Sequence, residues 1–323
     1  MANRGVEKLI DKIKQSMSEK RYYESHQLWR TIYFRLLKQE RYFELAEILY
    51  DGALQLINVK QFQSGSDLAL LLIEVLTKCT FNNNTKQFEK WIENVGSIIG
   101  KIDSSVVERE MLIVKAIKWS SQESNSKNPL MHKLIAKIMA NEQNYEQARH
   151  HSLLAKNGIF CAKILIQLSN KALNSEVDMI IVQVVLNLLI LKDERTAMTA
   201  FHFYVKHHPL IRTSELPFCS PLLNFAYFLL NIIDEKNLQA FTTLCDLYRT
   251  ALNRDPEYEK KLEKIGILFF NAPVKQENRG GGLFGDLFNQ LFQELENDSD
   301  SDNNENSMQS TSSNYLSSNV DLD

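Results

Sequence analysis

Apolar residues follow a helical spacing along most of this chain of 323 residues. Segments of roughly 12–18 residues carry apolar side chains at positions i, i+3, i+4 and i+7, which lie on one face of an α-helix. We expect about fourteen such helices, joined by short polar turns such as residues 81–85 and 120–128. At most, residues 211–220 form a small hairpin or an ordered loop. The pattern therefore predicts an all-α protein.

Several polar residues mark where helices begin. Asn128, Ser220 and Asp255 each precede a proline. This order is typical of a helix start, because the polar side chain accepts a hydrogen bond from a free backbone N–H and the proline has no N–H to lose. Residues 105–108 also have the form of a capping box, and residues 175–178 are a weaker version.

The order Arg-Tyr-aromatic-Glu occurs at residues 21–24 and 41–44, and a related stretch begins at residue 144. In each stretch a small residue follows an aromatic one by three positions, so both side chains lie on the same helix face. The ring fills the gap to the neighbouring helix, and the small residue lets that helix approach closely. Tetratricopeptide-like hairpins pack in this way, although their period of about 34 residues is missing here. We therefore expect an α-solenoid of stacked antiparallel helix pairs. The residue pairs are Phe43 with Ala46, Tyr145 with Ala148, and Tyr22 with Ser25.

The sequence changes character near its C-terminal end. We expect the solenoid to occupy residues 1–272, with a proline- and glycine-containing linker at 273–282. An amphipathic helix follows at 283–296, and residues 297–323 are acidic and disordered by composition. The amphipathic helix either folds back as the last solenoid helix or docks into a partner's groove. Its charged residues are all acidic, which disfavours binding to anionic lipid. Its apolar face consists of Leu283, Phe284, Leu287, Phe288, Leu291, Phe292 and Leu295.

Composition supports the helical prediction and shows an asymmetry of charge. With only 11 glycines and 6 prolines, the chain has few residues for the tight turns of an all-β fold. Its net charge is −3, but residues 280–323 contain no Lys or Arg. Residues 1–279 hold all 37 basic residues against 31 acidic ones, which gives a mildly basic body. Such a body suits an acidic protein surface and lacks the dense basic stripe expected for nucleic acid.

The remaining sequence features predict a cytosolic protein without catalytic chemistry. The four cysteines have no CxxC spacing, which fits a reducing compartment and argues against zinc and disulfides. The N-terminus has no apolar signal segment, and the apolar stretch 177–191 is too short to span a bilayer. No phosphate-binding glycine loop or hydrolase motif occurs. The pairs 150–151 and 207–208 are adjacent histidines that point about 100° apart, so they are poor chelates. We expect no enzyme activity, cofactor or metal.

Aromatic and charged residues alternate near the N-terminus, over residues 22–38. One interpretation is that the tyrosines pack while the charges are solvated. The other is a protein-docking face, because Tyr and Arg dominate interface energies. Further along, the stretch 64–67 is able to cap a helix, so Asp67 is expected to be a cap, with Glu74 two turns further on.

Six stretches of the chain resemble one known family. Together they are similar, from about residue 4 to residue 295, to the fourth Golgi-to-ER traffic factor family, the helical adaptor of the guided-entry pathway for tail-anchored membrane proteins. The stretches are residues 22–35, 64–74, 118–121, 175–192, 221–225 and 272–276.

The resemblance implies a cytosolic, non-enzymatic α-solenoid with a partner at each end. In the family, the N-terminal helices dock the targeting ATPase that carries tail-anchored proteins to the ER. The C-terminal half holds a ubiquitin-like partner in fungi, or in animals a proline-rich BAG-domain chaperone scaffold that brings the ubiquitin-like subunit. Carried over, the ATPase-docking residues are Tyr22, Tyr23, Glu24, His26, Arg35, Lys38, Asp67 and Glu74.

At the other end, residues 216–225 look more like the animal members, so the resemblance favours the BAG-domain scaffold. The implied partner-docking residues are Pro217, Phe218, Leu283, Phe284, Leu287 and Phe288. Two other classes stay open. A solenoid subunit of a proteasome-lid or signalosome-like assembly would need a winged-helix end, and a solenoid-fold transferase would need a cluster of ligand side chains.

Overall fold

The computed structural model describes residues 2–81, 84–122, 128–213 and 215–273, and within them it contains only helices, turns and loops. This confirms the all-α prediction, with fifteen α-helices where about fourteen were expected. They are α1 (Ala2–Ser18), α2 (Tyr22–Lys38), α3 (Tyr42–Asn58), α4 (Phe62–Leu76), α5 (Thr85–Lys101), α6 (Glu108–Ser120), α7 (Pro129–Asn141), α8 (Tyr145–Leu154), α9 (Gly158–Ser169), α10 (Val177–Ile190), α11 (Glu194–His207), α12 (Pro221–Ile232), α13 (Leu238–Leu247), α14 (Arg249–Leu252) and α15 (Glu257–Phe270). Two short 3₁₀ helices are η1 (Asn174–Glu176) and η2 (Ile233–Glu235).

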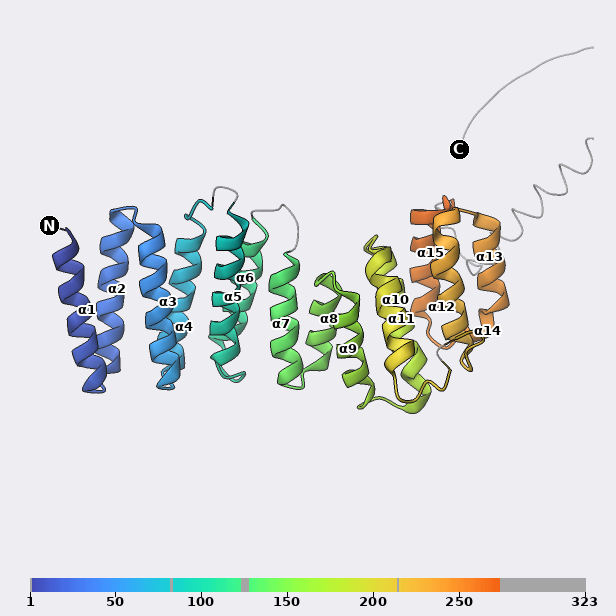
Figure 1. Cartoon of the computed structure of the whole chain (residues 1–323), viewed down its shortest axis with the longest axis horizontal. Coiled ribbons are helices and arrows are strands. Elements are labelled where there is room, and N and C mark those ends of the chain that lie inside the picture. The colour runs from blue at the N-terminus through green and yellow to red at the C-terminus, as the bar shows by residue number, and fades with distance from the viewer. Residues whose placement is uncertain (1, 82–83, 123–127, 214, 274–323) are drawn as a thin grey trace, which may run out of the picture.

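The helices stand side by side in one elongated row, from α1 at one end to α12–α15 at the other (Figure 1). Most helices pack against the next one along the chain; in addition α4 contacts both α2 and α6 along one side, and α5 contacts both α3 and α7 along the other. The predicted α-solenoid is thus confirmed. The proposed boundary at residue 272, the linker, the amphipathic helix and the acidic tail stay predictions, because residues 274–323 lie outside the described part of the chain.

The buried side chains form two clusters that meet at α9. The first runs from Val6 to Ile164, and the second from Cys161 to Phe270. Ile164 belongs to the first cluster and Leu165 to the second, so the two faces of one helix belong to different cores. The rod is therefore made of an N-terminal and a C-terminal half that share α9.

The twenty-residue repeat of Arg-Tyr-aromatic-Glu has a geometric cause. Each of α1, α2 and α3 is 17 residues long and is followed by a turn whose middle residue is left-handed, at Lys20, Glu40 and Lys60. The next N–H then bonds back to the carbonyl five residues earlier, as from Arg21 to Ser16 at 2.8 Å. This is the 6→1 bond of a Schellman motif. One helix and the turn after it have the same combined length in two successive repeats. The residues at the start of α2 and α3 therefore recur at the same interval.

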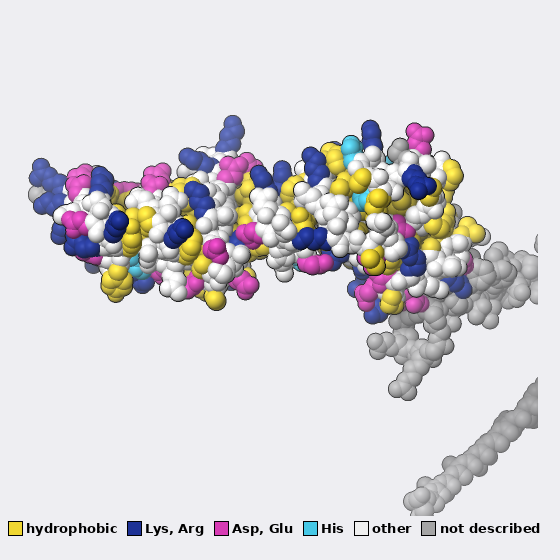
Figure 2. Space-filling view, turned by 90° about the horizontal axis from the view of Figure 1, so that it is seen from below, with side chains coloured by type: hydrophobic (Ala, Val, Ile, Leu, Met, Phe, Trp, Pro, Cys, Tyr) yellow, Lys and Arg dark blue, Asp and Glu magenta, His cyan; other side chains and the backbone are white. Residues whose placement is uncertain are grey.

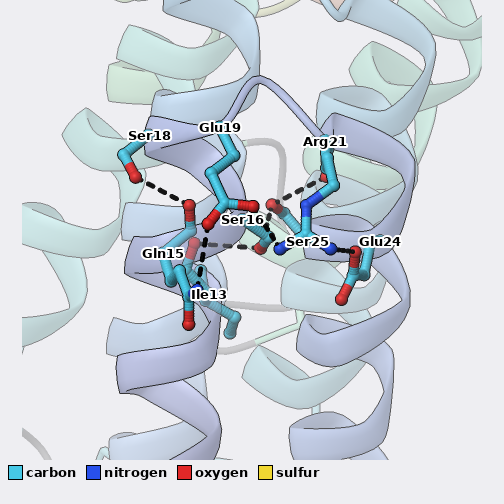
Figure 3. A network of polar contacts seen from close by, with 8 residues as sticks. All are labelled: Ile13, Gln15, Ser16, Ser18, Glu19, Arg21, Glu24 and Ser25. Atoms are coloured by element: carbon cyan, nitrogen blue, oxygen red, sulfur yellow. Dashed lines mark hydrogen bonds and ion pairs between the residues drawn. The ribbon is translucent and has the colours of Figure 1, made fainter.

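The small residues predicted at close contacts are buried. Ser25, Ala46 and Ala148 are fully buried. The hydroxyl groups of Ser16 in α1 and Ser25 in α2 lie 2.6 Å apart, which brings the two helices together where the chain turns (Figure 3). The aromatic partner Phe43 of α3 packs edge-on against Phe81 in the loop between α4 and α5. The packing rule inferred from the sequence therefore holds.

The helix-start signals were only partly correct. The Asn128 side chain accepts hydrogen bonds from the N–H groups of Leu130 and Met131, as expected for a cap. Asp255 accepts one from Glu257, but α15 begins at Glu257, one residue after the proline. Ser220 does occupy the N-cap position of α12, yet its hydroxyl donates to a more distant carboxylate, that of Asp178.

Neither predicted capping box forms as expected. The Ser105 hydroxyl donates to Asp103 at 2.6 Å, and α6 begins only at Glu108. At residues 175–178 the carboxylate of Glu176 accepts the N–H of Leu173 instead. Ser105 is thus satisfied by a local partner, whereas Asp178 pairs with Arg254 and accepts from Ser220, far along the chain.

Two arginine–carboxylate ion pairs join elements that are far apart in the sequence. Arg109 of α6 is 4% exposed; its Nε donates to the carbonyl of Ile99 at 3.2 Å, and its guanidinium pairs with Glu142 at 2.5 Å. In the C-terminal half, Arg254 pairs with Asp178 at 2.7 Å. Each arginine thus links the ends of helices that are distant in sequence.

The adjacent histidines have packing roles. His151 stacks on His132 of α7, with their Nδ1 atoms 2.9 Å apart. His208 is buried after α11, where its Nδ1 accepts the N–H of Leu210, so Nε2 carries the proton and donates to the Ser169 hydroxyl. Burial lowers the pKa of His208 below its ordinary value.

Gly158 should be the position in the rod least tolerant of a side chain. A methyl group there would lie 2.6 Å from the carbonyl oxygen of Thr196 and 2.7 Å from the backbone nitrogen of Ala200, so α11 would have to move. We expect Gly158→Ala to lower the free energy of unfolding by about 1–3 kcal/mol, measured by urea denaturation. The control is Gly100→Ala, where the nearest atom is a side-chain carbon of Ile138 at 3.4 Å and stability should hold or rise. Equal losses in both variants would contradict the close approach.

The buried His208 should make the fold less stable in mild acid. The pKa of His208 is lowered in the folded chain. Below about pH 6.5, His208 therefore binds a proton in the unfolded chain and stays neutral in the folded chain. The contribution of neutral His208 to the free energy of unfolding is complete above its unfolded-state pKa and is lost as the pH falls. We expect the wild type to lose more unfolding free energy than His208→Gln between about pH 7.5 and about pH 5.5. Parallel pH dependences of the two proteins would show that His208 does not contribute.

Candidate protein-docking site

Helix α2 divides the predicted ATPase-docking residues between two sides. His26 and Arg35 are nine residues apart, about two and a half turns, so they point in opposite directions from the helix axis. His26 points toward α4, and the Arg35 guanidinium lies over Gly5 of α1, where an added methyl would come within 2.6 Å. The predicted set therefore does not form one patch.

On the first side, a cluster of charges joins α2 to α4. The carboxylate of Asp67 lies 2.8 Å from His26 Nε2 and accepts from Arg30 Nη1 at 3.2 Å. Asp67 is the sixth residue of α4, which begins at Phe62, so its expected role as a helix cap is wrong. The side chains of Asp67 and Arg30 are 36% and 38% exposed, which leaves both partly accessible to a partner.

Glu74 extends this side toward α6. Its carboxylate accepts from the Tyr33 hydroxyl at 3.5 Å and lies 3.5 Å from Lys115 of α6. Burial and the nearby Glu74 raise the pKa of Tyr33, which keeps the phenol protonated as the donor. The side chains of three helices are thus linked in a single row.

Two exposed rings border the charges. Tyr23 is 76% exposed and Phe34 is 60% exposed, and Phe34 stands edge-on to Tyr33 at 5.1 Å between centroids. They are eleven residues apart, about three turns, so both lie on the same side of α2. Large exposed rings beside partly desolvated ion pairs are typical of a protein-binding surface. We call this surface the α2–α4 face; it consists of Tyr23, His26, Arg30, Phe34, Asp67 and Glu74.

Phe34 was not singled out from the sequence, and Arg30 was included only among the alternating aromatic and charged residues at 22–38. Arg30 follows His26 by one turn, and Phe34 follows Arg30 by one more, so a helical projection centred on His26 would have included both. Tyr22, by contrast, is half-buried and packs against the core.

The second side of α2 carries Glu24 and Arg35, and Lys38 lies between this side and Phe34, one turn after Phe34. We call Glu24, Arg35 and Lys38 the α1–α2 edge. Glu24 is held by Arg21 at 2.8 Å, and Arg21 also pairs with Glu19 at 2.5 Å (Figure 3). Arg35 and Lys38 are exposed in the last turns of α2. Basic and acidic side chains are interspersed over the N-terminal helices in Figure 2, so this end of the molecule is charged without being uniformly basic.

The predicted C-terminal docking residues occupy a different environment. Phe218 is 6% exposed and packs against Phe201 and Tyr227 in the second core cluster. Its N–H donates to the Asn224 side chain at 2.9 Å, and the preceding bond, Leu216–Pro217, is cis. Among described residues 211–213 and 215–220 no strand occurs, so the stretch is a loop anchored by a buried ring. Its docking role stays a prediction, and Leu283, Phe284, Leu287 and Phe288 lie outside the described residues.

The described residues offer neither a cluster of metal ligands nor a membrane-spanning helix. They contain no group of three or more His, Cys, Asp or Glu side chains placed to hold a metal ion. None of the helices found in them combines the length and the apolar character needed to cross a membrane.

The chain is similar to a set of known proteins over most of its length. The model of the family Golgi to ER traffic protein 4 matches residues 39–292. The Golgi to ER traffic protein 4 homologs of Xenopus tropicalis and Homo sapiens are each 38% identical over 284 residues, which is 87% of this chain and 86% and 85% of theirs. The crystal structure of C. therm. Get4 superimposes with a TM-score of 0.74 at 21% identity, covering 89% of this chain and 96% of that one.

Proposed function

Because the chain belongs to the Golgi to ER traffic protein 4 family, we propose that it is a non-enzymatic cytosolic adaptor for the delivery of tail-anchored proteins. In this role it joins the targeting ATPase at one end to a chaperone scaffold at the other. The proposal rests above all on the match to this family, which spans most of the chain. The elongated rod and its surfaces support it, because an adaptor needs separate sites for separate partners.

The α2–α4 face supplies what ATPase docking requires. Tyr23 and Phe34 offer exposed rings that a partner would bury, and Arg30 with Asp67 offers polar groups already fixed in place. Groups that are ordered before binding lose less entropy when the partner arrives. This face would supply most of the affinity.

The α1–α2 edge would guide the encounter. Arg35 and Lys38 are exposed cations on a body that holds 37 basic residues against 31 acidic ones in residues 1–279. Such charges attract an acidic partner over several ångströms and speed association, an effect that salt weakens. Lys38 acts here as a point charge, because lysine lacks the planar fork of arginine.

The C-terminal partner that we favour is the BAG-domain scaffold, with the ubiquitin-like subunit brought by it. The relatives named above from Xenopus tropicalis and Homo sapiens are animal proteins, and the loop before α12 is short and folded around Phe218. The competing assignment to a proteasome-lid or signalosome-like subunit has no support, because described residues 215–273 contain helices and turns and no small sheet.

Two double variants test which side of α2 docks the ATPase. We expect Arg35→Glu with Lys38→Glu to slow association, because it reverses the guiding charges. Tyr23→Ala with Asp67→Asn should speed dissociation, because it removes an anchor and unties the polar cluster. Each should raise the Kd for the purified ATPase at least about tenfold by surface plasmon resonance, with helical content unchanged.

The matched control is Lys86→Glu with Lys90→Glu on α5, which makes the same change of charge on exposed residues away from both surfaces. Its Kd should stay within about threefold of the wild type at physiological salt. If both docking variants bind like the wild type, the N-terminal end is not the ATPase site. If all three variants weaken binding equally, the effect is one of net charge and the assignment fails.

A further inference from the structure

A shallow groove of about 530 Å³ lies between α12 and α13 at the C-terminal end of the rod. Phe228 and Ile232 of α12 line one side, and Leu244 and Leu247 of α13 line the other. Leu247 is 75% exposed and Phe228 is 38% exposed, so apolar surface is open to solvent here. Hydrophobic side chains gather at this end of the molecule in Figure 2. Exposed apolar surface in a groove marks a binding site for another apolar surface.

The lining of the groove contains no charged residue. Its polar members are Asn237, Gln239, Thr243 and Tyr248, all uncharged. An occupant with charges on its contacting face would lose their hydration and gain no ion pair in return. The groove therefore selects a purely apolar face, as an amphipathic helix presents.

The described chain ends beside α13. After α15, Asn271 adopts a left-handed conformation, and the N–H of Ala272 bonds to the carbonyl of Gly266 at 3.1 Å. Gly266 faces the Cβ of Ala272 and the ring of Phe241, which belongs to α13 and stacks on Phe270. The chain is thus fixed against α13 at the point where it leaves the solenoid.

The remaining chain is long enough to reach the groove. Thr243 follows Phe241 by two residues, about 200° around α13, so the groove lies on the other side of a helix roughly 10–12 Å across. Residues 274–282 separate the exit from the apolar stretch at 283–296, and nine extended residues span at most about 30 Å. That length allows a path around α13 without strain.

We propose that residues 283–296 of the same chain occupy this groove as an amphipathic helix. The stretch carries Leu or Phe at seven positions of one face and no charged residue on that face, with Asp286, Glu294 and Glu296 on the other. As a helix it would be about 21 Å long, against about 15 Å for the ten residues of α13. Docked there, it would cover the apolar residues of the groove. Of the two roles open to this segment, the inference takes the intramolecular one, so Leu283, Phe284, Leu287 and Phe288 would contact the chain's own groove and not the C-terminal partner.

Disulfide trapping in the full-length chain tests this occupant. Cys219 is exposed and is first changed to Ser, while Cys79, Cys161 and Cys245 are buried. Burial raises the pKa of the Cys79 and Cys161 thiols to about 11, so these thiols do not compete. Thr243→Cys in the groove is combined with Leu287→Cys, and intramolecular disulfide formation is followed by mass spectrometry.

The matched control replaces Thr243→Cys with Lys264→Cys, an exposed position on α15 that is near the exit and outside the groove. We expect the groove disulfide to form at least about tenfold faster than the control disulfide, as docking raises the effective concentration. Leu247→Asp should abolish that difference; Leu247 is exposed, so the fold should persist, which circular dichroism would verify.

Two outcomes would overturn the proposal. Equal rates for groove and control cysteines would mean that the segment is not held there and that the groove is free for a partner protein. A groove disulfide found only between two chains would mean that a second copy supplies the helix.

Discussion

Close contact between helix backbones is the constraint on which the rest of this structure depends. Where helices meet, the residue at the crossing is small: Ser25 of α2 faces Ser16, Gly65 of α4 lies against Ala53 and Ile57, and Gly158 of α9 lies against the backbone of α11. Without these residues the helices would stand further apart, and the cavities left between them would destabilise the core. The same spacing fixes each helix pair relative to the next, so a local rule of sequence sets the length and direction of the whole rod.

A rod built in this way separates its surfaces. The α2–α4 face and the α1–α2 edge lie at the N-terminal end, and the α12–α13 groove lies at the other (Figure 1). The two halves have their own cores and share α9. The two ends of the rod therefore expose separate surfaces, which is the arrangement expected of an adaptor that must hold two proteins at once.

Sequence reasoning predicted those features that depend on short-range patterns. The apolar spacing, the small residues at helix crossings and the Asn128 cap all follow from neighbours within one or two turns, and all were found. It failed where a partner comes from far along the chain. Asp67 looked like a cap, but its partners His26 and Arg30 are 41 and 37 residues away. Ser220 looked like a cap as well, and its hydroxyl donates to Asp178, 42 residues away. Phe218 was expected at a docking surface from the family resemblance; in the folded chain its ring is buried, and its docking role stays a prediction.

The most direct test of the adaptor account is whether one chain holds both partners at the same time. Mass photometry of the full-length chain mixed with the purified targeting ATPase and the BAG-domain scaffold would count each assembly in the mixture. The account predicts a particle that contains all three proteins, and it predicts that excess scaffold leaves the fraction of chain bound to the ATPase unchanged. Particles that contain the ATPase or the scaffold, but never both, would contradict it, because the two partners would then share one surface.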